Sequence, residues 1–352
     1  MKNTFVLLAV FFFFVPLQAQ IIIEGTVYDA HSKEALPGVA VYLNGTSMAS
    51  SSDGNGYFRL LVTDKINTAL VFNFLGYEPL IIGNPFEYAE KTFFLHEKTE
   101  ILPEAVVVGD TFSRAEKMEA FKEQFLGNSR AGKSCIILNE EDIVLRYSPL
   151  EHRLTAFSRQ PLVIQNDYLA YLVRVDLLSF SIQYSRYTLN TSHIQQYSFT
   201  ATPSFFDQDP SNQKIAKRRQ EKYSESRQYF WKNFVDNTLD QANIKIYNGN
   251  KQTRPELHFS IESTPTHSIV RMLPDANLNR ARNGIGDMTI LGRISVLCHD
   301  RLASELLFMT DQITVDAFGN IDAVGKVRFS GEMGRQRIGD MIPLEYANRK
   351  AL

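Results

Sequence analysis

The sequence is poor in the residue types that usually mark a chemical site. Its 352 residues include two cysteines, Cys135 and Cys298, and one tryptophan. The seven histidines are scattered, without the spacing of a metal site. The 37 Lys and Arg residues nearly balance the 39 Asp and Glu residues, and the net charge of −2 argues against a nucleic-acid-binding surface. We therefore expect no metal, no cofactor and no nucleic-acid partner.

The sequence leaves open whether its two cysteines form a disulfide bond. A disulfide between Cys135 and Cys298 is chemically allowed in an oxidising compartment. Because connectivity cannot be read from sequence, this alternative stands beside the one that we favour, two buried free thiols.

Long apolar runs are also missing, except at the N-terminus. Lys2 precedes an apolar run at residues 5–15, and residues 17–19 (Leu-Gln-Ala) resemble a small-residue cleavage site. The run has roughly 11 apolar residues, against roughly 20 that span a bilayer, which is typical of a secretory signal. We predict a signal peptide at 1–19 and an exported chain in the periplasm or associated with the outer membrane. No cysteine lies near the cleavage site, which argues against a lipoprotein anchor.

Short strand patterns follow the signal. In GVAVYL (38–43) the apolar residues alternate with the period of a strand, and Asn44-Gly45 ends the segment as a turn. A second turn, with Gly56 expected at positive φ, leads to YFRLLV (57–62), and more extended segments follow up to residue 97. Strands this short and regularly spaced predict a β-sandwich of about seven strands.

The order of these motifs resembles a known family. G-T-V-x-D, L-P-G-V-x-V, D-G-N-G-Y-F and F-x-F-L-G-Y follow one another as in the carboxypeptidase regulatory-like domain, a transthyretin-like sandwich. The residues that carry the resemblance are Gly25, Val27, Asp29, Leu36, Pro37, Gly38, Val39, Asp53, Gly56, Phe58, Gly76 and Tyr77. It implies a domain at 20–97 that accompanies enzymes and transporters without performing their chemistry.

The resemblance also implies a compartment. Such domains precede the plug of many TonB-linked outer-membrane transporters, and LPEAVVVGD (102–110) resembles the L-x-E-V-V-V segment that follows them. We therefore expect the cell envelope of a Gram-negative bacterium. A complete transporter is disfavoured, because it needs more chain than follows residue 97.

After a linker at 98–112, the sequence predicts a larger β-rich domain at 113–346. Ser113 and Glu116 have capping-box spacing, which predicts a helix near 113–126. The expected fold class is therefore mainly β with a few helices. This part resembles envelope proteins that pair the same N-terminal domain with an uncharacterised β-rich domain, on segments such as FKEQFLGNSRAGKSCIILNEEDI and GEMGRQRIGDMIPLEY. The resemblance transfers no catalytic residues.

A second helical stretch is expected near 213–239. It begins with basic residues and continues with aromatic ones, a composition that fits nucleic acid or an anionic membrane surface. Glu221 and Glu225 interrupt the positive charge, and Tyr223, Phe230 and Phe234 fit a buried face. We therefore favour a solvated helix that packs its aromatic side inward.

Three patterns contain residue types used in catalysis. His31 and Glu34 form H-x-x-E, but zinc catalysis needs a third protein ligand. Cys298 and His299 are adjacent, and on a strand their side chains would point to opposite faces. The glycine-rich segment 283–287 lacks the lysine of a P-loop. We predict no catalytic, cofactor-binding or metal-binding residues.

These observations favour a non-enzymatic envelope protein, a binding or structural module for an envelope protein or a glycan, peripheral to the outer membrane. The alternative is a secreted hydrolase acting on peptides or glycans, with catalytic residues dispersed along the chain. A rigid cleft with paired carboxylates would favour that alternative. The oligomeric state stays open.

The signal peptide gives the first prediction. Signal peptidase should cut after Ala19, because the basic, apolar and small-residue regions follow one another in the required order. Mass spectrometry of the periplasmic fraction should then find Gln20 at the N-terminus. A mature chain that still begins at Met1 would contradict the prediction.

Overall fold

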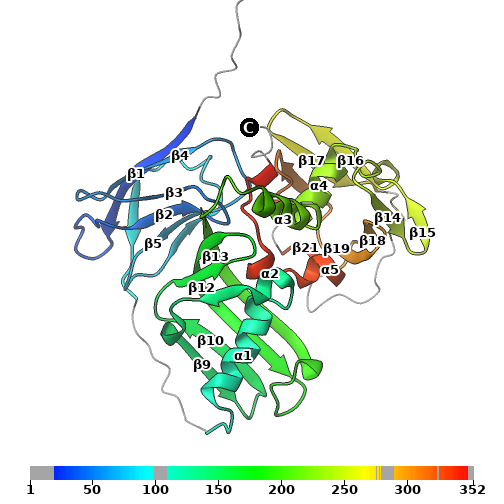
Figure 1. Cartoon of the computed structure of the whole chain (residues 1–352). Coiled ribbons are helices and arrows are strands. Elements are labelled where there is room, and N and C mark those ends of the chain that lie inside the picture. Colours follow the sequence, from blue (N-terminus) through cyan, green and yellow to red (C-terminus); the bar gives the residue numbers. More distant parts are fainter. Residues whose placement is uncertain are drawn as a thin grey trace, which may run out of the picture.

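Strands dominate the computed structural model, which describes residues 20–98, 109–274, 276, 278, 289–322 and 325–347. The fold is mainly β with a few helices, as the sequence predicts. The predicted signal peptide, the glycine-rich segment 283–287 and most of the linker lie outside the described residues. The described elements form three parts, each with its own hydrophobic core (Figure 1).

The first part is the predicted seven-stranded β-sandwich. One sheet has the order β4-β1-β7, with β1 antiparallel to β4 and parallel to β7, and the other is antiparallel with the order β3-β2-β5-β6. Phe58, Phe72 and Phe93 fill the space between the sheets. The strands are β1 (Ile21–Asp29), β2 (Ala40–Leu43), β3 (Ala49–Ser51), β4 (Tyr57–Val62), β5 (Leu70–Asn73), β6 (Leu80–Ile82) and β7 (Thr92–Leu95).

The second part is a six-stranded antiparallel sheet covered by α1 (Arg114–Phe125). The order is β8-β11-β12-β10-β9, and β13 pairs along the free side of β12. The predicted capping box of Ser113 and Glu116 starts α1, and Phe121 and Phe125 pack on Phe180 of β12. The other elements are α2 (Arg130–Lys133), β8 (Cys135–Ile137), η1 (Glu140–Asp142), β9 (Ile143–Ser148), β10 (Arg153–Ser158), β11 (Leu162–Asn166), β12 (Tyr171–Tyr184), η2 (Thr191–His193) and β13 (Ile194–Asp207).

The third part contains two antiparallel sheets, β15-β14-β18-β19-β21 and β16-β17-β20. Trp231 and Phe234 of α4 (Arg227–Val235) fill its core together with Phe259 and Phe308. The other elements are β14 (Ile244–Asn248), β15 (Lys251–Thr253), η3 (Pro255–Leu257), β16 (Phe259–Ser263), β17 (His267–Met272), β18 (Gly292–Cys298), β19 (Leu302–Phe308), β20 (Gln312–Asp316), β21 (Val327–Ser330) and α5 (Gly331–Arg335). After them, η4 (Ile338–Asp340) returns to the second part, since Ile338 belongs to its core.

The helical stretch expected at 213–239 is two helices, α3 (Gln213–Ser224) and α4, separated at Glu225 and Ser226. The expectation of one long helix was therefore wrong. Ser226 ends the continuity because its side chain accepts the Tyr229 N–H as the N-cap of α4. The two helices also serve different cores, since Tyr223 belongs to the second part and Phe230 to the third.

Both cysteine thiols are free in the structure. Cys298 is buried at the end of β18, whereas Cys135 is partly buried in β8. Burial raises the pKa of Cys135 to about 12 and that of Cys298 to about 11. Both groups are therefore protonated at neutral pH, and neither is an activated thiolate.

Buried hydrogen bonds fix the sandwich to the second part. The Tyr42 hydroxyl donates to Asp176 at 2.5 Å and lies 2.9 Å from the Thr202 hydroxyl. The turn after β2 continues the contact, because the Gly45 N–H donates to the Pro203 carbonyl at 2.7 Å. The outer face of the four-stranded sheet is therefore an internal interface.

The C-terminal segment 336–346 lies where the three parts meet, and Figure 1 shows it in red between them. Ile342 and Tyr346 enter the core of the second part. The Leu344 N–H donates to the Gly45 carbonyl of the sandwich at 2.8 Å, and Gln336 donates to the Glu225 carbonyl between α3 and α4 at 2.9 Å. One segment thus joins all three parts.

The predicted turn at Gly56 gives the second prediction. Gly56 has φ +74°, and a Cβ atom there would lie 2.5 Å from the Val27 carbonyl oxygen. We expect Gly56→Val to destabilise the sandwich by about 1–2 kcal/mol from backbone strain, with the clash adding to this cost. Urea unfolding of residues 20–98, which have their own core, measures the loss.

Gly54 in the same turn is the matched control. A Cβ atom there has no neighbour within 4 Å, so Gly54→Ala should be nearly neutral. Equal stability of Gly56→Val and the wild type would contradict the turn argument, and a helical circular-dichroism spectrum of the fragment would contradict the fold.

The third prediction concerns pH. Burial raises the pKa of Asp176, so the folded chain holds this proton more tightly than the unfolded chain. The stability from this group is complete below the ordinary aspartate pKa of about 4 and is lost as pH rises through the folded pKa. Asp176→Asn should therefore lose less stability relative to the wild type at pH 7 than at pH 4, which thermal unfolding measures. A difference in Tm that is independent of pH would contradict the prediction.

Candidate functional site

A cavity of about 310 Å³ lies between the second and third parts. The end of α1 and the loop before α2 line one side, β18 and β19 line another, and the segment 332–340 closes it together with the end of α3. A second, more open groove of about 680 Å³ follows α1. The two hollows meet at Glu123, Gly127 and Asn128, which line both of them.

Small residues allow the segment 336–340 to pack closely against the loop before α2. Gly127, at φ +95°, ends α1, and a Cβ atom there would lie 3.0 Å from the Arg337 Cβ. A Cβ atom on Gly339 would lie 2.5 Å from the Gly132 Cα. These contacts place the polar residues of the segment at the cavity.

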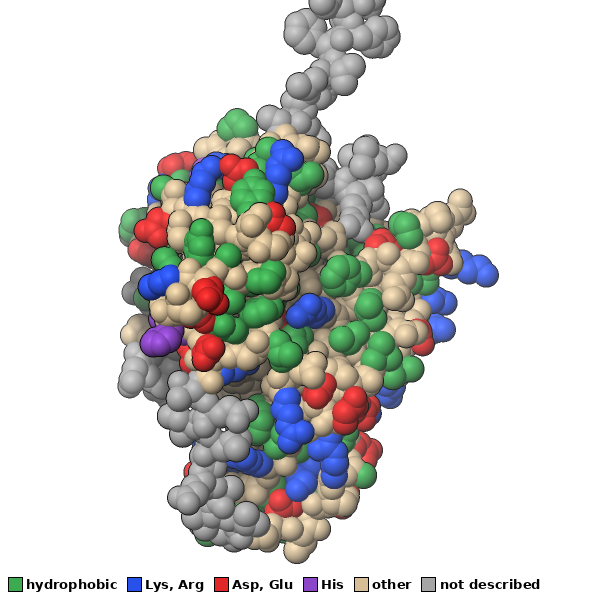
Figure 2. Space-filling model, turned by 90° about the vertical axis from the view of Figure 1, so that its left-hand side faces the viewer, with side chains coloured by type: hydrophobic (Ala, Val, Ile, Leu, Met, Phe, Trp, Pro, Cys, Tyr) green, Lys and Arg blue, Asp and Glu red, His purple; other side chains and the backbone are tan. Residues whose placement is uncertain are grey.

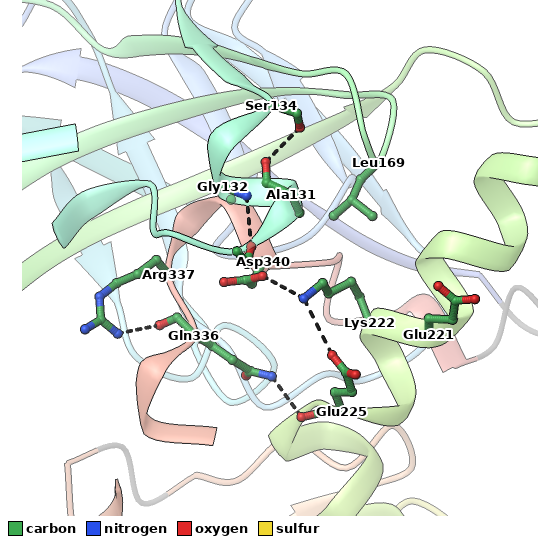
Figure 3. Close-up of polar contacts among 12 residues, drawn as sticks. Ala131, Gly132, Ser134, Leu169, Glu221, Lys222, Glu225, Gln336, Arg337 and Asp340 are labelled. Atoms are coloured by element: carbon green, nitrogen blue, oxygen red, sulfur yellow. Dashed lines mark hydrogen bonds and ion pairs between the residues drawn. The ribbon is translucent and has the colours of Figure 1, made fainter. Parts of the chain in front are cut away.

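Lys222 is the centre of the polar contacts in the cavity (Figure 3). Its ammonium group lies 2.9 Å from an Asp340 oxygen and 3.5 Å from a Glu225 oxygen. Burial opposes the positive charge, but the two carboxylates together raise the pKa of Lys222. Glu225 is also 3.2 Å from Arg301, so this carboxylate is shared between two cations.

The other carboxylates of the cavity are also engaged. Glu332 forms an ion pair of 2.7 Å with Arg335, and Glu123 accepts the Asn128 side-chain amide at 2.6 Å. The thiol of Cys298 lines the cavity and stays protonated, since burial raises its pKa to about 11. The lining thus offers paired charges and amides for binding rather than a free base beside a nucleophile.

Arg337 differs from these residues, because its guanidinium has no carboxylate partner in the described part of the chain. It lies 4.2 Å above the centre of the Tyr197 ring. One terminal nitrogen, Nη1, donates to the carbonyls of Gly334 and Gln336, each at 3.1 Å.

The structure places the H-x-x-E pattern apart from this cavity, whereas Cys298 lines it. His31 and Glu34 lie in the exposed turn after β1, where Asp29 accepts the His31 N–H. Among the described residues, no three His, Cys, Asp or Glu side chains gather as a metal-binding group. His152 follows β9, which pairs through β10 with the C-terminal half of β12, whereas Cys135 lies in β8, which pairs through β11 with the N-terminal half of β12.

His299 is a correction to the strand argument. It does not continue β18 but takes φ +54° in the turn that follows, and its ring lies 3.3 Å from the Ser224 carbonyl. The turn arises because β18 and β19 pair antiparallel, with Cys298 opposite Leu302. His299 therefore points at α3.

Sequence reasoning missed the cavity, because its residues come from four distant segments. Lys222 belongs to the basic start of the helical stretch, and Asp340 lies more than a hundred residues later, near the C-terminal end of the described chain. The one available signal was the dense run of charged and glycine residues in GEMGRQRIGD (331–340). Nothing in that run identifies its partners.

None of the described helices is long and apolar enough to cross a membrane. Residues 23–108 match the family model described as CarboxypepD_reg-like domain, so the chain contains a carboxypeptidase regulatory-like domain at its N-terminal end. The remaining chain is unassigned, and no curated protein matches the sequence.

Proposed function

We propose that this chain is an exported, non-enzymatic binding protein of the bacterial cell envelope. Its regulatory-like domain is a fixed support, and the cavity between the second and third parts receives a portion of an envelope protein or a glycan. The observation that carries the proposal is the lining of this cavity. Three of its carboxylates are already paired with Lys222, Arg301 or Arg335, and Glu123 accepts the Asn128 amide, so they suit recognition of a polar ligand.

The rigid attachment of the sandwich supports the same function. The outer face of its four-stranded sheet is buried against the second part, where Tyr42 bonds to Asp176. The outer face of β4-β1-β7 is exposed to solvent. Ile22 and Leu61 pair directly across β1 and β4 with 43% and 48% of their surface exposed. Figure 2, seen from the sandwich side, shows hydrophobic side chains dispersed among charged ones. This face and the strand edges are the second contact surface of the proposal.

The alternative, a hydrolase, rests on one observation. Glu225 and Asp340 are two carboxylates in one cavity, as an acid–base pair would be. Both are bound to the same Lys222, so neither can act as a free base while the ion pairs hold. Binding is therefore the function that the geometry supports best.

The fourth prediction tests binding in the native envelope. A photo-reactive amino acid replaces Asn128, which is exposed and lines both hollows. Irradiation should give one reproducible adduct, identified as protein or glycan by mass spectrometry. The same label at Leu150, which is 83% exposed and far from the cavity in sequence and sheet order, is the control. Equal labelling at both positions would contradict a specific site.

A companion measurement separates binding from hydrolysis. The purified chain should cleave neither peptides nor glycans, with or without added zinc, and Glu34→Gln should change nothing, because Glu34 lies on the exposed turn. Zinc-dependent cleavage that Glu34→Gln abolishes would overturn the proposed function.

A further inference from the structure

Arg337 is a buried cation without an internal counter-charge. Its side chain belongs to a residue that is only 8% exposed, and its Nε has no hydrogen-bond partner among the described residues. Stacking on Tyr197 and the bonds from Nη1 to two carbonyls hold the guanidinium in one orientation. A buried charge is normally paired with an opposite charge. The Arg337 guanidinium has no such partner among the described residues, so we expect an anion from outside the chain to pair with it.

Arg219 shows what the same chain does when the anion is internal. It is 5% exposed and lies 3.9 Å above the Tyr171 ring, so its burial and stacking match those of Arg337. Both of its terminal nitrogens donate to Asp207 at 2.8 Å, and Nε donates to the Leu169 carbonyl at 2.8 Å. Arg337 likewise stacks on an aromatic ring and donates to backbone carbonyls, but no carboxylate among the described residues pairs with it.

A second cation, Arg227, lies near Arg337 and adds to the local positive charge that an anion would neutralise. Arg227 donates through Nε and Nη2 to the Met333 carbonyl at 3.1 and 3.0 Å, and it forms no ion pair with a described residue. Burial lowers the pKa of Arg227; the Tyr197 phenol opposes this shift and the charge of Arg337 adds to it. The two guanidinium groups bind the carbonyls of adjacent residues, Met333 and Gly334, so the two positive charges lie near each other.

We propose that Arg337 is the receptor for a carboxylate or phosphate group on the ligand of this cavity. The inference rests on the proposed binding function and adds the chemical class of the ligand. A guanidinium nitrogen forms a charge-assisted hydrogen bond with an oxygen of such a group, and Nη2 is the nitrogen available for it, because Nη1 is engaged with two carbonyls and Nε is itself buried.

The other charges of the cavity limit this ligand further. Glu123, Glu225, Glu332 and Asp340 also line it and would repel a polyanion. The ligand therefore carries one anionic group beside Arg337 and neutral polar groups elsewhere. An acidic sugar residue of a glycan and the carboxylate of a peptide both have this chemistry.

Direct observation of the arginine Nε–H signals by NMR tests the site in the mature chain. The signal of Arg337 is the one that disappears in Arg337→Lys. Acetate, glucuronate, N-acetyl-alanyl-alanine and inorganic phosphate are added separately to about 20 mM, roughly twenty times a millimolar Kd. At least one probe should shift this signal in a saturable way, and the probe that binds best distinguishes a sugar, a peptide and a phosphate source.

Variants distinguish a receptor from a structural cap of α5. Arg337→Lys should weaken the bound probe at least tenfold, since lysine keeps the charge but loses the planar group that the Tyr197 ring and the two carbonyls hold in place. Arg146→Lys is the matched control, because Arg146 also stacks on a ring, that of Phe157, but lies on β9 outside the cavity. It should leave probe affinity unchanged.

Asn128→Trp provides a second variant that keeps Arg337 and narrows the cavity from its exposed rim, and it should abolish the shift. The inference is overturned if no probe shifts the Arg337 signal in the wild type, or if Asn128→Trp leaves the shift undiminished. If the NMR signal shifts in a saturable way but the envelope experiment finds no cross-linked partner, the anion site at Arg337 is supported and the proposed macromolecular ligand is refuted.

Discussion

The C-terminal segment 336–346 is the constraint on which the arrangement of the three parts depends. It contributes Ile342 and Tyr346 to one core, donates a backbone bond to Gly45 of the sandwich, and reaches the junction of α3 and α4 through Gln336. The bond to Gly45 and the close approach of Gly339 to Gly132 are backbone contacts, whereas Ile342, Tyr346 and Gln336 act through their side chains. The segment is therefore fixed by both its path and its side chains.

Buried carboxylates complete the attachment of the sandwich. Asp176 accepts the Tyr42 hydroxyl, Asp316 accepts the Asn67 N–H, and Glu345 accepts both the N–H and the hydroxyl of Ser47. In each contact the sandwich supplies a neutral donor. Burial raises the pKa of Asp176 and Asp316, so these contacts cost stability when the carboxylates ionise. They also specify one orientation, since an unmatched buried carboxylate would cost several kcal/mol.

The cavity follows from this arrangement. Its walls belong to the second and third parts, and the segment that joins the parts also supplies Arg337 and Asp340. Ligand binding at Arg337 would therefore act on the residues that hold the parts together. The carboxylates around Lys222 are paired and the thiol of Cys298 is protonated, so the lining offers polar groups without an activated nucleophile among the described residues.

The sequence by itself determined the local structure, because turns and caps depend on neighbours in the chain. The positive φ of Gly56, the capping box of Ser113 and the strand alternation of β4 were predictable, as was the regulatory-like sandwich. Tertiary structure alone decided that the helical stretch breaks at Ser226, since its two halves fill different cores. It also decided the cavity, because Lys222 and Asp340 meet only through folding, and no local pattern encodes a contact between segments so far apart.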